Sequence, residues 1–161
     1  MNVNLSTTQI STQNISWLEQ KANNIMRGNF TKLSYISPDF TMNGIYLQFP
    51  IHVSNLDIID NKAQMKFNPN SSLNQYIVKE FAKIENRLLD NYIQTRQHNL
   101  KKVILLAKQL YSGFMKIYKE TYGNFIESND KYFYVKISGV WETDDTCGLT
   151  YKLYGGLNLS N

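Results

Sequence analysis

Alternation of apolar and polar side chains, in two separate parts of the chain, limits the fold more than any other feature. Ile45, Leu47 and Phe49 fall on one side of their segment, and Tyr46 and Gln48 fall on the other. A period of two residues is typical of a strand with one buried face. The segment before them ends at a Ser-Pro-Asp turn and is rich in β-branched and aromatic residues. The predicted strands are residues 30–37, 44–53, 62–68, 133–141 and 147–154.

The period changes to that of a helix between the third and fourth predicted strands. Apolar residues recur from Leu73 to Tyr92 at steps of 4, 4, 3, 4 and 4, which is one face of a helix. Ser72 and Gln75 have the spacing of a capping box at its start. A second apolar series, from Val103 to Ile117, predicts a second helix, with a stop at residues 122–124. The sequence therefore predicts a helical insert over residues 71–120.

The order of these elements indicates a fold that is mainly β with an α insert. Five strands with a helix between the third and fourth match an OB-like five-stranded barrel, whose closure removes the sheet edges. An open α+β sheet with a helical hairpin is the rival. The 161 residues favour one domain. Residues 1–14 are predicted to be a loose arm and residues 15–26 a short helix, while residues 131–155 form a C-terminal hairpin.

Composition argues against several classes of protein. A single cysteine, Cys147, rules out a disulfide framework and a cysteine-rich zinc site, and the two histidines lie far apart. No apolar run approaches the roughly 20 residues of a membrane helix. Glycine-rich phosphate loops, nucleophile elbows and paired carboxylates are missing from the sequence, so we expect neither an enzyme nor a cofactor or metal. We expect an intracellular protein whose net charge of +4 permits a polyanionic partner.

The C-terminal hairpin carries a resemblance. The stretches Val135–Thr143 (VKISGVWET) and Cys147–Leu153 (CGLTYKL) are similar to the closing hairpin of single-stranded DNA-binding proteins of large nucleocytoplasmic DNA viruses. Residues 42–50 resemble an early strand of that group. The resemblance implies an OB-fold that binds single-stranded DNA during replication or repair, in the replication compartment of a host cell. Many single-strand binders end in an acidic tail, whereas residues 155–161 contain no acid, and the predicted insert is long for the minimal fold.

The outward positions of the predicted strands supply what a single-strand binder needs, namely aromatic rings for bases and cations for phosphates. Tyrosine and lysine are frequent at these positions and acids are absent. Arginine, histidine and lysine at residues 96, 98, 101 and 102 add charge near the helix junction. These residue types do not distinguish DNA from RNA. The candidate nucleic-acid-binding residues are Tyr46, Gln48, Lys62, Lys66, Tyr132, Tyr134, Lys136, Lys152, Tyr154, Arg96, Lys101 and Lys102.

The other chemically notable residues have structural interpretations. Trp141 is predicted to lie in the core and Gly139 to mark a bulge or a tight bend. Cys147 is interpreted as a small buried apolar residue. Glu80 and Glu85 are interpreted as solvent-exposed residues of a helix surface.

Four tyrosines fall on the predicted helices and favour an alternative function. They are interpreted as packing residues or as contacts to a partner. In this alternative the chain is a structural or assembly protein that docks a partner, or a second copy of itself, through the helical insert. The four are Tyr76, Tyr92, Tyr111 and Tyr118.

Overall fold

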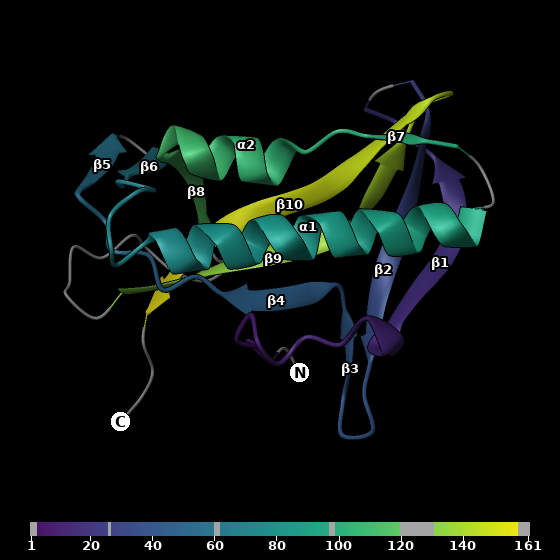
Figure 1. Cartoon of the computed structure of the whole chain (residues 1–161), viewed down its shortest axis with the longest axis horizontal. Helices are drawn as coiled ribbons and strands as arrows, with labels where there is room; N and C mark the ends of the chain where they lie inside the picture. The colour runs from purple at the N-terminus through teal and green to yellow at the C-terminus, as the bar shows by residue number, and fades with distance from the viewer. Residues whose placement is uncertain (1–2, 26, 60–61, 97–98, 120–130, 158–161) are drawn as a thin grey trace.

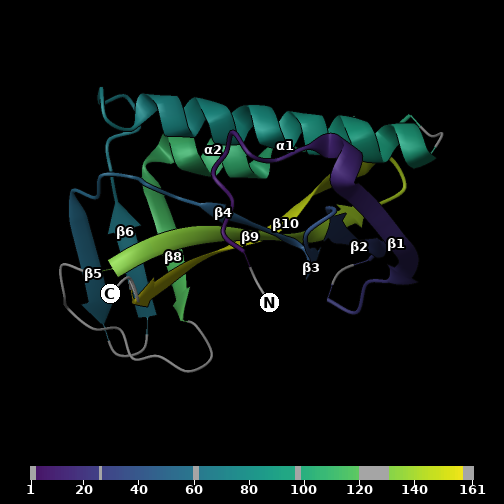
Figure 2. The same ribbon diagram turned by 90° about the horizontal axis from the view of Figure 1, so that it is seen from below.

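A sheet of ten strands, covered on one face by two helices, makes up the part of the chain that the computed structural model describes (Figures 1 and 2). The described residues are 3–25, 27–59, 62–96, 99–119 and 131–157. The helices are α1 (Gln75–Arg96) and α2 (Leu105–Ser112), and a short 3₁₀ turn spans Thr12–Asn14. The strands are β1 (Ile15–Ala22), β2 (Asn29–Ile36), β3 (Thr41–Asn43), β4 (Ile45–Gln48), β5 (Asn55–Ile59), β6 (Lys62–Lys66), β7 (Lys101–Lys102), β8 (Phe114–Lys119), β9 (Lys131–Glu142) and β10 (Thr146–Leu157).

The strand order is β1-β2-β9-β10-β8-β6-β5, and this path stays open. Strand β3 pairs with β2, β4 with β9, and β7 with β10. Both pairings of β10 with β8 and β7 are parallel, and the others are antiparallel. The prediction of a mainly β fold with an inserted helical segment is confirmed, but the five-stranded barrel is wrong. The apolar face of the open sheet is covered by helices instead of being enclosed by closure.

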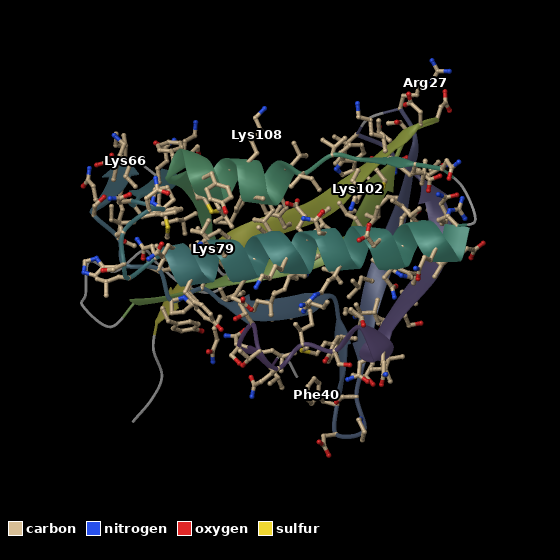
Figure 3. The ribbon with its side chains drawn as sticks, viewed as in Figure 1. Arg27, Phe40, Lys66, Lys79, Lys102 and Lys108 are labelled. Carbon is tan, nitrogen blue, oxygen red and sulfur yellow. The ribbon has the colours of Figure 1, made fainter. Side chains whose placement is uncertain are left out.

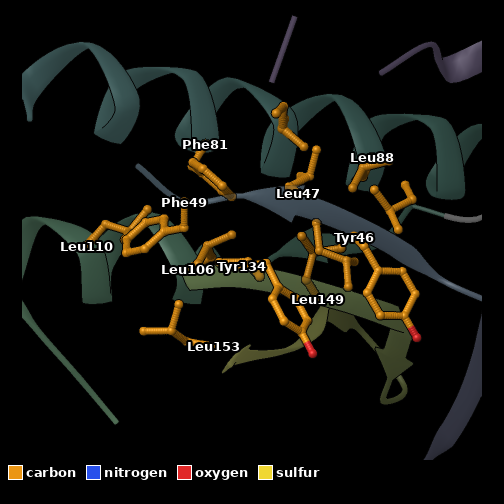
Figure 4. Packing of buried hydrophobic residues seen from close by; sticks show 14 of the residues in the cluster. Tyr46, Leu47, Phe49, Phe81, Leu88, Leu106, Leu110, Tyr134, Leu149 and Leu153 are labelled. Atoms are coloured by element: carbon orange, nitrogen blue, oxygen red, sulfur yellow. The ribbon is translucent and has the colours of Figure 1, made fainter. Parts of the chain in front are cut away.

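The core lies between the sheet and the helices, as Figure 4 shows. Leu47 of β4 and Phe49, which directly follows that strand, are almost fully buried. The ring of Phe49 meets that of Phe81 on α1 edge to face, with centroids 5.3 Å apart. Leu106 of α2 and Leu149 of β10 complete this layer. Burial of such side chains contributes about 1.5–3 kcal/mol each.

The β9–β10 hairpin forms as predicted, with a turn in which the Thr143 N–H donates to the Thr146 carbonyl over 2.9 Å. Pairing steps from Ile137↔Tyr151 to Gly139↔Thr150, so Ser138 is an extra residue and the predicted bulge is present. A bulge shifts the alternation of the strand that follows it.

The bulge moves different residues into the core than simple alternation predicts. Val140 and Glu142 are buried, while Trp141 is only half-buried and its indole lies over Gly148. The prediction that Trp141 is a core residue is therefore wrong. Gly139 is required for close packing, because a Cβ there would lie 2.1 Å from the Thr31 carbonyl oxygen of β2.

Three segments differ from the sequence-based prediction. Residues 15–22 form strand β1 and not a helix. The second helix ends at Ser112, where Gly113 takes a left-handed conformation (φ 73°), and the chain continues as β8. Strand β8 lies between β10 and β6, so residues 71–120 are not a separable insert. Helix α1 begins at Gln75, three residues after the predicted cap at Ser72. The predicted stop at 122–124 lies outside the described residues.

The N-terminal segment is attached to the sheet and is not a loose arm. Leu5 is 6% exposed, and its backbone N–H donates to the Tyr46 carbonyl over 2.8 Å. Its carbonyl accepts from the Gln48 N–H, also over 2.8 Å. The segment thus covers the edge of β4, which would otherwise present unpaired backbone groups.

Candidate nucleic-acid interface

Five tyrosine rings from four strands form one continuous cluster on the sheet. We call Tyr46, Tyr118, Tyr132, Tyr134 and Tyr154 the tyrosine cluster. Ring centroids are 6.0 Å apart for Tyr46–Tyr134, 5.3 Å for Tyr134–Tyr154 and 6.2 Å for Tyr154–Tyr118. Tyr132 stacks on Tyr134 at 6.0 Å. All these distances lie in the range of attractive aromatic pairs.

The tyrosine cluster lies on the sheet face opposite the helices. Leu47, Val135 and Leu153 point toward the helices and are at most 1% exposed. Their neighbours in sequence point the other way, because side chains alternate along a strand. Figure 4 shows the hydroxyl ends of Tyr46 and Tyr134 directed away from α1. Pairing of Tyr154 with both Tyr134 and Tyr118 then brings the rings of neighbouring strands together.

Three lysines run beside the tyrosines on the same face. Lys136 of β9 lies directly opposite Lys152 of β10. The ammonium nitrogens of Lys116 and Lys152 lie 4.7 and 4.8 Å from the centroid of the Tyr118 ring. That of Lys136 lies 5.5 Å from the Tyr46 ring. These are cation–π distances, so each lysine is positioned by a tyrosine of the cluster.

The positive charge of this face has little compensation. Like charges directly opposite each other in a sheet are destabilising. In the described parts of β4, β6, β8, β9 and β10, no carboxylate shares this face. Asp57 faces the same way on the edge strand β5, opposite Gln64. An arrangement with adjacent lysines and one distant acid is suited to binding an anion.

The members of the tyrosine cluster differ in exposure. Tyr46 and Tyr134 are each 9% exposed, because neighbouring rings cover them. Tyr118, Tyr132 and Tyr154 are half-buried. The last three rings therefore present the accessible surface, and Tyr46 and Tyr134 support it from within.

Most of the predicted site residues are on this face. Six of them belong to the cluster or to its lysines: Tyr46, Tyr132, Tyr134, Lys136, Lys152 and Tyr154. Three more are exposed at its margins. Gln48 lies opposite Tyr134, while Lys62 and Lys66 lie on β6 beside β8.

The structure does not bring the remaining predicted residues to this face. Arg96 donates from Nε to the Glu142 carboxylate over 3.2 Å, on the helix side of the sheet. Lys102 lies 2.8 Å from Asp90 of α1. Lys101 pairs with Thr146, at the opposite end of β10 from Tyr154. His98 lies outside the described residues.

Two members of this face, Lys116 and Tyr118, were missed by the sequence-based interpretation. They lie on β8, which was predicted to be the end of a helix. The signal that could have found them is the alternation after Gly113. Met115 and Ile117 are almost fully buried, and Lys116 between them is exposed.

Glu142 is the centre of a separate buried polar cluster. Its carboxylate accepts from the Tyr92 hydroxyl, from Arg96 and from Gln20 Nε2 at 2.9 Å. Burial, together with this carboxylate, raises the pKa of Tyr92 to about 12. The cluster joins α1, β1 and β9, so we assign it a structural role.

Glu85 also has a structural role, and the prediction that it is solvent-exposed is wrong. Its carboxylate is fully buried and accepts from the Leu106 and Ala107 N–H groups, each over 2.8 Å. These bonds satisfy two of the free N–H groups at the start of α2. Burial raises the pKa of the Glu85 carboxyl, although the backbone bonds oppose this.

Comparison with other proteins adds no assignment. The sequence matches no model of a known protein family and no curated protein, and the fold matches no solved structure. The described residues contain no group of three or more potential metal ligands. No helix in the described part of the chain has the length and apolarity to cross a membrane.

Proposed function

We propose that this protein binds single-stranded DNA without sequence preference through the tyrosine cluster and the lysines beside it. The observation that carries the proposal is the continuous contact of five tyrosine rings with three lysines on the sheet face that the helices leave uncovered. A role in replication or repair, and a place in the host-cell replication compartment, belong to the same proposal.

The chemistry of the face matches that of a single strand. Each base that stacks on an aromatic side chain contributes about 1–3 kcal/mol, whatever its identity, because every base has a π-face. Lysines neutralise phosphates and release counterions. In a duplex the base faces are covered by stacking on one another. A duplex can therefore contact the lysines through its phosphates, but its bases cannot stack on the tyrosine rings.

The register suggests a path for the strand. Lys136 and Lys152 lie on neighbouring strands about 4.8 Å apart, and Lys116 lies on the next strand along. The tyrosines of the same three strands lie two residues away. The phosphates would follow the lysines across β9, β10 and β8, and the bases would turn toward Tyr118 and Tyr154.

Fluorescence anisotropy with a labelled oligothymidylate tests the proposal. We expect binding by the purified protein at low salt, with much weaker binding of a duplex of the same length. Tyr118→Ala should weaken binding about 5- to 150-fold, the equivalent of one base stack. Tyr76→Ala is the matched control, because Tyr76 is 56% exposed on α1. Absence of binding at low salt, or equal losses in both variants, contradicts the proposal. Comparison with an RNA oligonucleotide of the same length shows whether the 2′-hydroxyl group of the sugar changes the affinity.

A further inference from the structure

A line of cations follows the exposed side of helix α1. Lys79, Lys83 and Arg87 are exposed and spaced four residues apart, so they lie on one helix face over about 12 Å. Like charges at this spacing destabilise a helix. Glu80 partly compensates Lys83, with Oε1 3.3 Å from Nζ. In the described part of the chain, no carboxylate lies within ion-pair distance of Lys79 or Arg87.

These cations border a hollow between the two helices. The hollow has a volume of about 430 Å³, and we call it the helix groove. Tyr111 of α2 is 52% exposed and is the aromatic residue of its lining. Figure 3 shows Lys108 of α2 directed away from α1, so this lysine is outside the groove. The lining residues are Lys79, Ala82, Lys83, Asn86, Arg87 and Tyr111.

We propose that the helix groove is a second binding site for single-stranded nucleic acid, with phosphates on Lys79, Lys83 and Arg87 and a base on Tyr111. The groove combines a flat, accessible ring with cations in a row, which is the chemistry that single strands require. The guanidinium of Arg87 can hold a phosphate through two parallel hydrogen bonds. The ring distinguishes this groove from a purely electrostatic patch for acidic proteins.

The helix groove and the tyrosine cluster lie on opposite sides of the sheet, so the two can be occupied at the same time. The helices cover one side of the sheet (Figure 2), and the alternation of side chains along β9 and β10 puts the tyrosine cluster on the other. A short oligonucleotide in the helix groove therefore does not occupy the tyrosine cluster. One chain can hold two strand segments at the same time, which is the property needed to bridge or pair strands. Binding in the helix groove is independent of the proposed function, whereas the holding of two segments by one chain rests on it.

Native mass spectrometry of the full chain with a short oligothymidylate tests this inference. We expect complexes with two oligonucleotides per chain for the wild-type protein and with one for Lys79→Gln/Arg87→Gln. Lys21→Gln/Lys108→Gln removes the same number of positive charges outside the groove and should retain two. An oligonucleotide carrying 5-iodouracil should form a photo-crosslink at Tyr111, and this measurement does not depend on a variant that folds.

The outcomes separate the two proposals. We call Lys79→Gln/Arg87→Gln the groove variant. If it still binds two oligonucleotides, or if no crosslink forms at Tyr111, the second site is overturned. The combination Tyr118→Ala/Lys152→Gln should also reduce two oligonucleotides to one. If it retains two while the groove variant retains one, the proposed function fails and the second site stands. A polyglutamate peptide that binds the groove in place of the oligonucleotide overturns the inference in favour of an acidic protein partner.

Discussion

Lys152 offers the sharpest perturbation of the proposed interface. Its ammonium group contacts the Tyr118 ring at 4.8 Å, and its strand position is directly opposite Lys136. Lys152→Gln removes one cation from a row of three and leaves every ring of the tyrosine cluster in place.

The expected change in the salt dependence of binding follows from counterion release. For a single strand, the slope of log K against log salt is about −0.7 per neutralised phosphate, so three lysines give about −2.1. Affinity should then fall about 18-fold between about 50 and about 200 mM salt. With Lys152→Gln the slope becomes about −1.4, and the same change of salt lowers affinity only about 7-fold.

The fold should tolerate this substitution. Removal of the repulsion from Lys136 gains about 0.2–1 kcal/mol. Loss of the contact with the Tyr118 ring costs about 0.5–1 kcal/mol. The two effects nearly cancel, so the free energy of unfolding should change little, and denaturant unfolding checks this.

The assay is an anisotropy titration of labelled oligothymidylate at several salt concentrations. Lys21→Gln is the control, because Lys21 is exposed on β1, at the other end of the sheet. Identical slopes for the wild-type protein, Lys152→Gln and Lys21→Gln would refute the reasoning that this lysine meets a phosphate.

Three further predictions concern the fold. Glu85→Gln replaces one acceptor oxygen with an NH₂ group that faces a backbone N–H of α2, and should lower the free energy of unfolding by about 1–3 kcal/mol in a denaturant titration. Burial raises the pKa of Cys147 to about 11 and that of Tyr151 to about 12, so the contribution of these two groups to stability should be constant below about pH 9 and decrease as pH rises from there to about pH 12. A melting temperature that does not change over that range would contradict these pKa values. Gly139→Val places a side chain on the Thr31 carbonyl and should shift the thermal midpoint down by more than Gly155→Ala, whose new methyl group meets only side chains.

The sequence predicts best those elements in which local pattern and tertiary contacts agree. In β9 and β10, strict alternation, a Thr-Asp-Asp-Thr turn and β-branched residues all favour a hairpin, and the structure has it. The outward tyrosines and lysines of these strands were found for the same reason. Their mutual contact depends on which strands are neighbours, and that follows from pairing between residues distant in sequence.

The β8 segment shows where local pattern is insufficient. Leu110, Phe114 and Ile117 are spaced four and three residues apart, which fits a helix, while Phe114–Tyr118 also alternates as a strand does. Gly113 decides between them by ending α2, and pairing with β10 and β6 stabilises the strand. Tertiary pairing therefore overrides the helical spacing.

The charged residues at the end of α1 illustrate a second limit. Arg96 was predicted to bind nucleic acid because it lies in a basic, polar stretch. Its partner, Glu142, is 46 residues away and becomes buried only because the bulge at Ser138 shifts the alternation of β9. A long-range ion pair of this kind leaves no mark in the spacing of the sequence.

Nuclear magnetic resonance of tyrosine rings labelled with ¹³C tests the central claim most directly. Titration with oligothymidylate should shift the ring signals of Tyr118, Tyr132 and Tyr154, while the signal of Tyr76 on α1 stays unchanged. If the oligonucleotide binds and those three ring signals do not move, the tyrosine cluster is not the interface and the account is contradicted.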